Sequence, residues 1–198
     1  DLAPPFIALL VSGGHTMLLD VPAWGEYRLL GQTLDDAVGE AFDKVGTMLG
    51  LDYPAGAAVE RLAATGDPAR YDFPRPMLKE TGEHRFAFSF SGLKTAVLRA
   101  VRASEDVARD RNDLARGFQD AALEVLVEKT ARAVIGYGRP RAVVVGGVAC
   151  NRTLTTAMRA RLEGIATVTV ANPRLNTDNA AMIAVAGGWR LAAGEQSG

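Results

Sequence analysis

The chain has 198 residues, of which 48% are hydrophobic and 23% are charged, and its formal net charge is −1. This composition is typical of a folded globular protein, and the charge excludes a general attraction to nucleic acids or anionic membranes, so such binding requires a local patch. The single cysteine, Cys150, excludes a disulfide within the chain and favours a reducing compartment. The apolar stretch from Ala180 to Trp189 is too short to span a bilayer.

Three short strands are predicted first, from apolar runs separated by turn residues, at about residues 6–12, 16–21 and 26–30. Between the first two, Ser12, Gly13 and Gly14 predict a tight turn in which two residues lack a Cβ atom. Such a turn can expose backbone N–H groups to an anion, as a phosphate-binding hairpin does. The alternative is an ordinary hairpin turn, because Gly-Gly is a common connection between strands.

Helices are predicted for the middle of the chain, where apolar residues recur at helical spacing: 35–49, 57–64, 91–103 and 112–136. In the first of these, Asp36, Glu40 and Asp43 fall on the side opposite the apolar residues. Residues 66–90 are predicted to form a long ordered loop, and loops of that length are usually functional or mobile.

The last third alternates strands and helices: a strand at 141–145, a turn at 146–151, a helix at 152–163, a strand at 167–170 and a helix at 179–193. This alternation predicts parallel strands covered by helices. Gly146 and Gly147 follow a strand just as Gly13 and Gly14 do. Two such turns can face one nucleotide, one at its phosphates and the other along its base or ribose.

Seven motifs occur together in a family-specific order, and they span nearly the whole chain: Leu10-Val-Ser-Gly-Gly-His-Thr16, Asp35-Asp36 followed by Gly39-Glu-Ala-Phe-Asp-Lys44, Leu51-Asp-Tyr-Pro54, Phe73-Pro-Arg-Pro76, Phe88-Ser-Phe-Ser-Gly-Leu-Lys-Thr95, Gly146-Gly-Val-Ala-Cys-Asn151 and Thr177-Asp-Asn179. With them the chain resembles the TsaD family of tRNA threonylcarbamoyl-adenosine transferases, formerly labelled glycoproteases or O-sialoglycoprotein endopeptidases.

The resemblance implies an α/β protein with the actin-like ATPase (ribonuclease H-like) fold, a mixed sheet flanked by helices and a largely helical insertion at about residues 52–137. It makes residues 1–198 the second lobe of that fold. Members usually carry a first lobe with a His-x-x-x-His metal motif, whereas this chain starts at Asp1 and its two histidines, His15 and His84, are not so spaced. We therefore expect the C-terminal part of a longer protein, with the first lobe absent.

The resemblance also assigns residues that bind the substrate or nucleotide: Leu10, Val11, Ser12, Gly13, Gly14, Asp43, Gly56 and Asn151. Asp43 would accept hydrogen bonds from ribose hydroxyls, and the alternative is a solvated carboxylate. For Asn151 the alternative is a helix N-cap. Asp178 is implied as a metal ligand, with a helix cap as the alternative. His15, Lys94, Gly146 and Gly147 are further candidates, and no catalytic side chain is assigned.

Residues 70–116 are locally basic, which indicates either a solvated helical face or a track for tRNA phosphates that includes Lys94. Cys150 is expected to be a small buried residue with no role as a nucleophile.

The implied reaction transfers a threonylcarbamoyl group from threonylcarbamoyl-adenylate to N6 of the adenosine next to the anticodon, in tRNAs that read codons starting with A. One divalent metal, Fe²⁺ or Zn²⁺, is implied with a site incomplete in this chain, and the cleft would hold the adenylate or ATP/ADP. Implied partners are tRNA and TsaB-like and TsaE-like proteins, in the cytoplasm and without a membrane. The chain alone could lack activity.

Two alternatives remain open at this point. A metalloendopeptidase of the glycoprotease type should carry a metal-binding histidine pair with a nearby glutamate, which the sequence does not show. A nucleotide-binding module without catalysis is the other.

Overall fold

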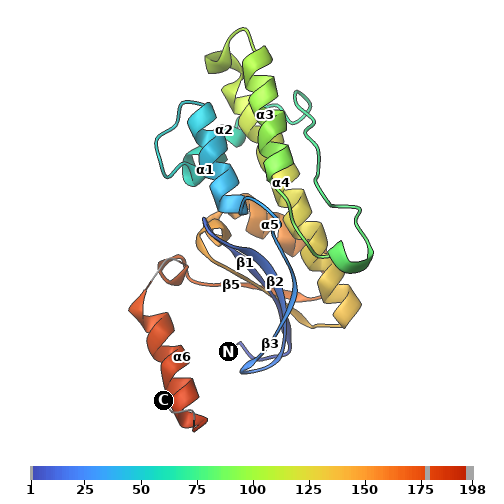
Figure 1. Ribbon diagram of the computed structural model, residues 1–198, viewed down its shortest axis with the longest axis vertical. Coiled ribbons are helices and arrows are strands. Elements are labelled where there is room, and N and C mark those ends of the chain that lie inside the picture. The colour runs from blue at the N-terminus through green and yellow to red at the C-terminus, as the bar shows by residue number, and fades with distance from the viewer. Residues whose placement is uncertain (1, 177–178, 195–198) are drawn as a thin grey trace.

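The computed structural model of the chain describes residues 2–176 and 179–194, and its centre is a five-stranded mixed sheet (Figure 1). The strands are β1 (Phe6–Val11), β2 (Thr16–Ala23), β3 (Glu26–Gln32), β4 (Arg141–Val145) and β5 (Thr167–Val170). They lie in the order β3-β2-β1-β4-β5. The first three strands form an antiparallel meander, whereas β4 and β5 run parallel to β1. The predicted mixed sheet is thus confirmed.

The helices are α1 (Val38–Met48), α2 (Gly56–Ala63), α3 (Ser91–Ala103), α4 (Val107–Tyr137), α5 (Arg152–Leu162) and α6 (Ala180–Ala192), with short 3₁₀ turns η1 (Gly82–His84), η2 (Gly147–Cys150) and η3 (Pro173–Leu175). In Figure 1, α1, α2 and α3 stand beyond one end of the sheet, while the long α4 runs from them down the sheet beside α5. Among the described residues, no helix is both long and apolar enough to cross a lipid bilayer.

The main core forms where the alternating side chains of β1 meet the helices. Ile7, Leu9 and Val11 point to one face and are completely buried, as expected for the inward side of a strand. On the helical side, the rings of Phe42 from α1 and Phe118 from α4 pack edge to face with centroids 4.9 Å apart. This packing fixes α1 and α4 beside the end of β1, where the Ser-Gly-Gly turn begins.

Two helices begin several residues away from their predicted starts. The first helix starts at Val38 and not at Asp35, because Asp35 accepts a hydrogen bond from the Phe90 backbone N–H (2.8 Å) at the start of α3. The Val38 N–H is satisfied by Thr16 Oγ1 at 2.9 Å. The helix predicted at 112–136 starts earlier, at Val107, because the Asp106 side chain caps it.

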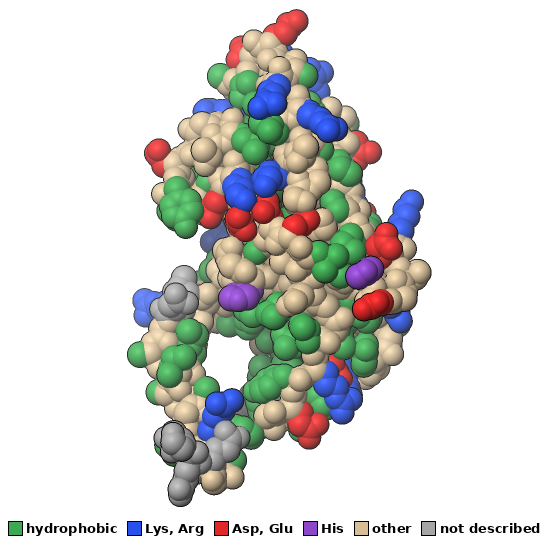
Figure 2. All heavy atoms as spheres, viewed as in Figure 1, with side chains coloured by type: hydrophobic (Ala, Val, Ile, Leu, Met, Phe, Trp, Pro, Cys, Tyr) green, Lys and Arg blue, Asp and Glu red, His purple; other side chains and the backbone are tan. Residues whose placement is uncertain are grey.

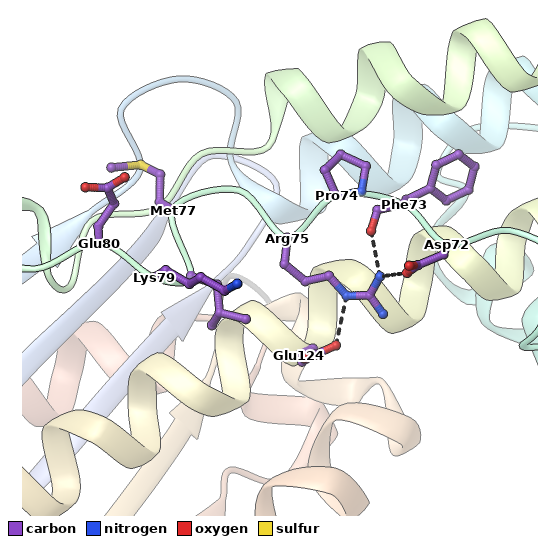
Figure 3. A pocket seen from close by; sticks show the side chains of 9 residues that line it. Asp72, Phe73, Pro74, Arg75, Met77, Lys79, Glu80 and Glu124 are labelled. Atoms are coloured by element: carbon purple, nitrogen blue, oxygen red, sulfur yellow. Dashed lines mark hydrogen bonds and ion pairs between the residues drawn. The ribbon is translucent and has the colours of Figure 1, made fainter.

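The predicted long loop, residues 66–90, is ordered by side chains of α4. Arg75 donates to Glu124 (2.9 Å) and also pairs with Asp72, as Figure 3 shows. Further along, Arg132 of α4 donates to the Leu78 carbonyl oxygen at 2.8 Å. These contacts hold the loop as a strap along α4, around an open hollow of about 690 Å³.

The last helix, α6, differs from the others because none of its described residues is buried. Its apolar side chains include Ile183, Val185 and Leu191, which are 68%, 73% and 71% exposed. Together with Trp24 and Tyr27 of the β2–β3 hairpin, α6 borders an apolar hollow of about 750 Å³. Figure 2 shows hydrophobic side chains around an opening between α6 and the sheet. Contiguous exposed apolar side chains of this kind are typical of interaction sites.

Candidate functional site

The turn formed by Ser12, Gly13 and Gly14 joins β1 to β2 and is closed by its own hydrogen bonds. The Ser12 N–H donates to the His15 carbonyl oxygen (2.8 Å), and the His15 N–H donates to Ser12 Oγ (3.0 Å). The Gly39 N–H of α1 donates to the Ser12 carbonyl oxygen at 3.2 Å. Within residues 2–176 and 179–194, the N–H groups of Gly13 and Gly14 donate to no acceptor. The turn therefore presents two unused donors to an anion.

The second glycine turn lies beside the first because β1 and β4 are parallel neighbours and end at the same edge of the sheet. Gly146 has a φ of +99°, and a Cβ atom there would lie 2.3 Å from the Val11 carbonyl oxygen. A side chain at position 146 would thus force the two turns apart. Gly147 differs, because a Cβ atom on it, as on Gly13, would meet no protein atom within 4 Å.

A cavity of about 370 Å³ opens between these turns, lined by Gly13, Gly39, Phe42, Asp43, Pro54, Gly56, Ala57, Glu60, Gly147, Val148, Cys150 and Asn151. Sequence reasoning singled out five of these residues: Gly13, Asp43, Gly56, Gly147 and Asn151. The structure brings them together from four separate segments of the chain.

Asp43 lies on α1, where its carboxylate reaches across to the loop before α2. Its Oδ1 accepts a hydrogen bond from the Ala55 N–H at 2.8 Å. Its Oδ2 accepts from no group in the described part of the chain, so this oxygen can accept a hydrogen bond from a ligand. The carboxylate is therefore oriented by the protein on one side and open to the cavity on the other.

The N-terminus of α5, at the other end of the cavity, is already capped. Asn151 Oδ1 accepts from the Leu154 N–H (2.9 Å), as an N-cap does. Glu60 of α2 accepts from the N–H groups of Arg152 (2.7 Å) and Thr153 (3.3 Å). A phosphate would meet the Glu60 carboxylate here, not free N–H groups, so this end suits the neutral part of a nucleotide.

Sequence reasoning missed Glu60 and misjudged Cys150. Glu60 lies one helical turn after Gly56 on the same helix, and that spacing was the only available signal. Cys150 was predicted to be buried, but it is exposed and lines the cavity. The prediction was wrong because η2 turns Cys150 toward the cavity, whereas its neighbour Ala149 points into the core.

The other candidates lie outside the cavity lining. Leu10 and Val11 belong to β1 and lead into the turn, and Val11 is completely buried. Ser12, Gly14 and His15 form the outer side of that turn, where Gly14 and His15 are exposed. Lys94 is engaged by Asp36 at 2.5 Å, and Gly146 supports the backbone approach described above.

The predicted metal ligand, Asp178, lies outside the described residues. Within residues 2–176 and 179–194, no three His, Cys, Asp or Glu side chains lie close enough to hold a metal ion. Figure 2 shows the two histidine side chains well apart on the surface. The described residues therefore do not by themselves fit a metal centre.

Asp35 joins the segment before α1 to the start of α3 and is expected to make stability depend on pH. Burial raises its pKa, but hydrogen bonds from Ser89, Phe90 and Ser91 outweigh burial and leave the pKa below the ordinary value. A carboxyl with a depressed folded-state pKa stabilises the fold above its unfolded pKa of about 4, and this contribution disappears as the pH falls through the folded value.

We expect Asp35→Asn to lower the free energy of unfolding by about 1 kcal/mol at neutral pH, because weaker neutral hydrogen bonds replace the charge-assisted ones from Ser89, Phe90 and Ser91. Urea unfolding at several pH values should show a smaller loss of stability on acidification in the variant than in the unchanged protein. Equal acid sensitivity in both proteins would contradict this role of Asp35.

Comparisons with known proteins identify the family of this chain. A family model described as "TsaD: tRNA N6-adenosine threonylcarbamoyltransferase" matches residues 1–185. Curated relatives with the name tRNA N6-adenosine threonylcarbamoyltransferase include one from Gemmatimonas aurantiaca, 57% identical over 98% of this chain and 58% of that protein. Another, from Geotalea daltonii, is 53% identical over 96% of this chain and 56% of that protein. The chain thus spans somewhat more than half the length of these relatives.

Two solved structures share the fold at low sequence identity. HypF from T. kodakarensis matches with a TM-score of 0.68 and 13% identity, over 95% of this chain and 34% of that chain. The activator of 2-hydroxyisocaproyl-CoA dehydratase from Clostridium difficile, solved with bound ADPNP, matches with a TM-score of 0.56 and 12% identity, over 99% of this chain and 65% of that chain. Both have actin-like folds, as predicted here. Since the family model covers nearly the whole chain and the relatives exceed half identity, the chain belongs to the TsaD family of tRNA N6-adenosine threonylcarbamoyltransferases.

Proposed function

We propose that the cavity binds an adenylate, with the phosphate at Gly13 and Gly14 and the base toward Gly147 and α5. The supporting observation is the contrast between the two ends of the cavity. The first turn carries two unused N–H donors, whereas Glu60 and Asn151 already occupy those at α5. The open oxygen of Asp43 lies between these ends and would accept a ribose hydroxyl.

We further propose that the full-length protein transfers threonylcarbamoyl from its adenylate to N6 of the tRNA adenosine next to the anticodon. In that reaction a bond forms between N6 and the carbamoyl carbon, the bond from that carbon to the phosphate oxygen breaks, AMP leaves and N6 loses a proton. The N–H groups of Gly13 and Gly14 would stabilise the phosphate of the departing AMP. The names of the curated relatives support this activity.

An assay that measures threonylcarbamoyl-adenosine formed on tRNA tests this activity. It uses the full-length protein with TsaB-like and TsaE-like partners in a buffer that resembles the cytoplasm. Product formation is expected, and no product from intact, metal-loaded protein would refute the transferase. A divalent metal, Fe²⁺ or Zn²⁺, remains a prediction from the resemblance, and Asp178 is its one proposed ligand in this chain.

We propose that residues 1–198 form the second lobe, with the insertion at about 52–137, and that the first lobe of the longer protein covers α6. The relatives are longer than this chain, which spans 58% of the one from Gemmatimonas aurantiaca. The apolar side chains of α6 that remain exposed support such a cover.

Gly147→Ala tests the nucleotide cavity without a change in folding. No protein atom lies within 4 Å of the added methyl group, so the free energy of unfolding should change by less than about 0.5 kcal/mol. The methyl group would instead occupy ligand space, and AMP affinity measured by calorimetry should fall at least about tenfold through steric exclusion. Unchanged AMP affinity would show that the ligand does not approach this backbone.

We propose that the basic track for tRNA lies on the exposed side of α3. Lys94 is neutralised by Asp36, but Arg99 and Arg102 are exposed and form no ion pair within residues 2–176 and 179–194. Figure 2 shows cationic side chains over α3 above a cluster of acidic and basic residues.

We expect Arg99→Ala and Arg102→Ala each to weaken tRNA binding and to reduce the slope of log affinity against log salt by about 1. A filter-binding salt titration measures this slope. Arg28→Ala on β3, also exposed and unpaired within the described chain, is the matched control and should leave the slope unchanged. Equal slopes in all four proteins would exclude the α3 track.

A further inference from the structure

A second hollow lies directly beside the nucleotide cavity, on the outer face of α1. It measures about 300 Å³ and is lined by Gly13, Glu40, Asp43, Lys44, Thr47 and Tyr53. It shares Gly13 and Asp43 with the nucleotide cavity. A group bound in this hollow would therefore lie next to the proposed adenylate without occupying its place. We refer to this hollow as the α1 groove.

Tyr53 at the rim of the α1 groove is the most exposed large hydrophobic residue in the described chain, at 80%. It lies in the segment that joins α1 to α2, two residues before Ala55, whose N–H is held by Asp43 at 2.8 Å. The other strongly exposed aromatic residues, Trp24 and Tyr27, lie in the β2–β3 hairpin beside α6. Tyr53 does not line that apolar hollow, so the surface at α6 gives no reason for its exposure.

The charges of the α1 groove disfavour a phosphate. Lys44 is paired with Glu40 (2.6 Å) and with Asp36 (3.1 Å), so it is not available to an anion. The Lys44 ammonium pairs with Oε1 of Glu40, while Oε2 of Glu40 has no partner within residues 2–176 and 179–194. A flat neutral ring with an amino group suits a groove that offers an exposed aromatic face and carboxylate acceptors.

We propose that the α1 groove receives the acceptor nucleobase of the RNA substrate, which stacks on Tyr53 with its exocyclic amino group toward Glu40. This inference rests on the proposed transferase function, since it places the base beside the adenylate. An enzyme that modifies a base must take it out of its stack, and aromatic side chains commonly hold unstacked bases. Gly13 lines both the α1 groove and the nucleotide cavity, so a base in the groove lies near the phosphate end of the cavity.

The test uses the full-length protein and an anticodon stem–loop RNA in which 2-aminopurine replaces the acceptor adenine. This fluorescent base stacks as adenine does but lacks the reactive N6 amino group. Binding should quench its fluorescence in the unchanged protein and in Tyr53→Phe, which keeps the ring. Tyr53→Ala should remove the quenching and weaken RNA binding about tenfold, the loss expected for one stacked base. Tyr137→Ala, an exposed tyrosine at the end of α4 that lines neither the α1 groove nor the hollow at α6, should behave as the unchanged protein.

AMP binding to the same variants separates this inference from the proposed function. Tyr53→Ala should bind AMP normally, because Tyr53 does not line the nucleotide cavity. If AMP fails to bind even the unchanged protein while Tyr53→Ala still loses quenching, the adenylate proposal fails and the stacking role stands. Unchanged quenching and RNA affinity in Tyr53→Ala would overturn the inference. A lower melting temperature with unchanged RNA binding would also overturn it, since Tyr53 would then pack against another part of the longer protein.

Discussion

Asp43→Ala in the full-length protein is expected to weaken AMP binding by about 100-fold, because it removes a charged acceptor of ribose hydroxyls worth roughly 1.5–3 kcal/mol per hydrogen bond. The substitution also removes the Asp43 Oδ1 atom that accepts the hydrogen bond from the Ala55 N–H, so the loop before α2 loses this contact with α1. Asp43→Asn separates these two effects. The amide oxygen can still accept from Ala55, but the amide nitrogen that replaces Oδ2 cannot accept a ribose hydroxyl.

Calorimetric titration with AMP measures the effect, and Asp36→Ala is the matched control. Asp36 precedes α1 and pairs with Lys44 (3.1 Å) and Lys94 (2.5 Å), but it does not line the nucleotide cavity. We expect Asp36→Ala to leave AMP affinity within about threefold of the unchanged protein, since Asp36 makes no contact with the cavity. Equal affinities in Asp43→Ala and Asp36→Ala would contradict the ribose role.

Gly146→Ala is expected to produce the largest loss of stability, roughly 2–6 kcal/mol from backbone strain and overpacking together. The backbone of Gly146 has φ 99° and ψ 170°, a conformation that essentially only glycine adopts. The added Cβ would also lie 2.3 Å from the Val11 carbonyl oxygen, and a backbone atom in a buried strand cannot easily move away.

Urea unfolding followed by circular dichroism measures this loss. Gly147→Ala is again the neighbouring control, because it adds the same methyl group in open space. Equal stability of the two variants would show that the contact between η2 and β1 is looser than the structure indicates. The expected result would show that the fold requires glycine at position 146 but tolerates a Cβ atom at position 147.

The strands and both glycine turns could be predicted because their signals are local. For β1, the continuous apolar run and the following Ser12, Gly13 and Gly14 lie within one short segment of sequence. The strand at Arg141–Val145 was located correctly for the same reason. The parallel pairing of β1 and β4 then brought the two turns to one edge, as the alternation of strands and helices implied.

Contacts between distant parts of the chain could not be predicted in this way. Asp35 looks like the first residue of a helix, yet its carboxylate accepts from Ser91, 56 positions later. Glu60 looks like a solvated helical residue, yet it caps α5 some 92 positions away. The early start of α4 was missed because its first turns are highly charged and lack a clear apolar period.

The most direct test of the adenylate cavity is a crystal structure of the full-length protein with AMP. The account predicts the phosphate within hydrogen-bonding distance of the N–H groups of Gly13 and Gly14, a ribose hydroxyl on Asp43 Oδ2, and the base against Gly147. AMP bound in the reverse direction, with its phosphate at the N-terminus of α5 in place of the Glu60 carboxylate, would contradict it. So would AMP bound at any other place on the molecule.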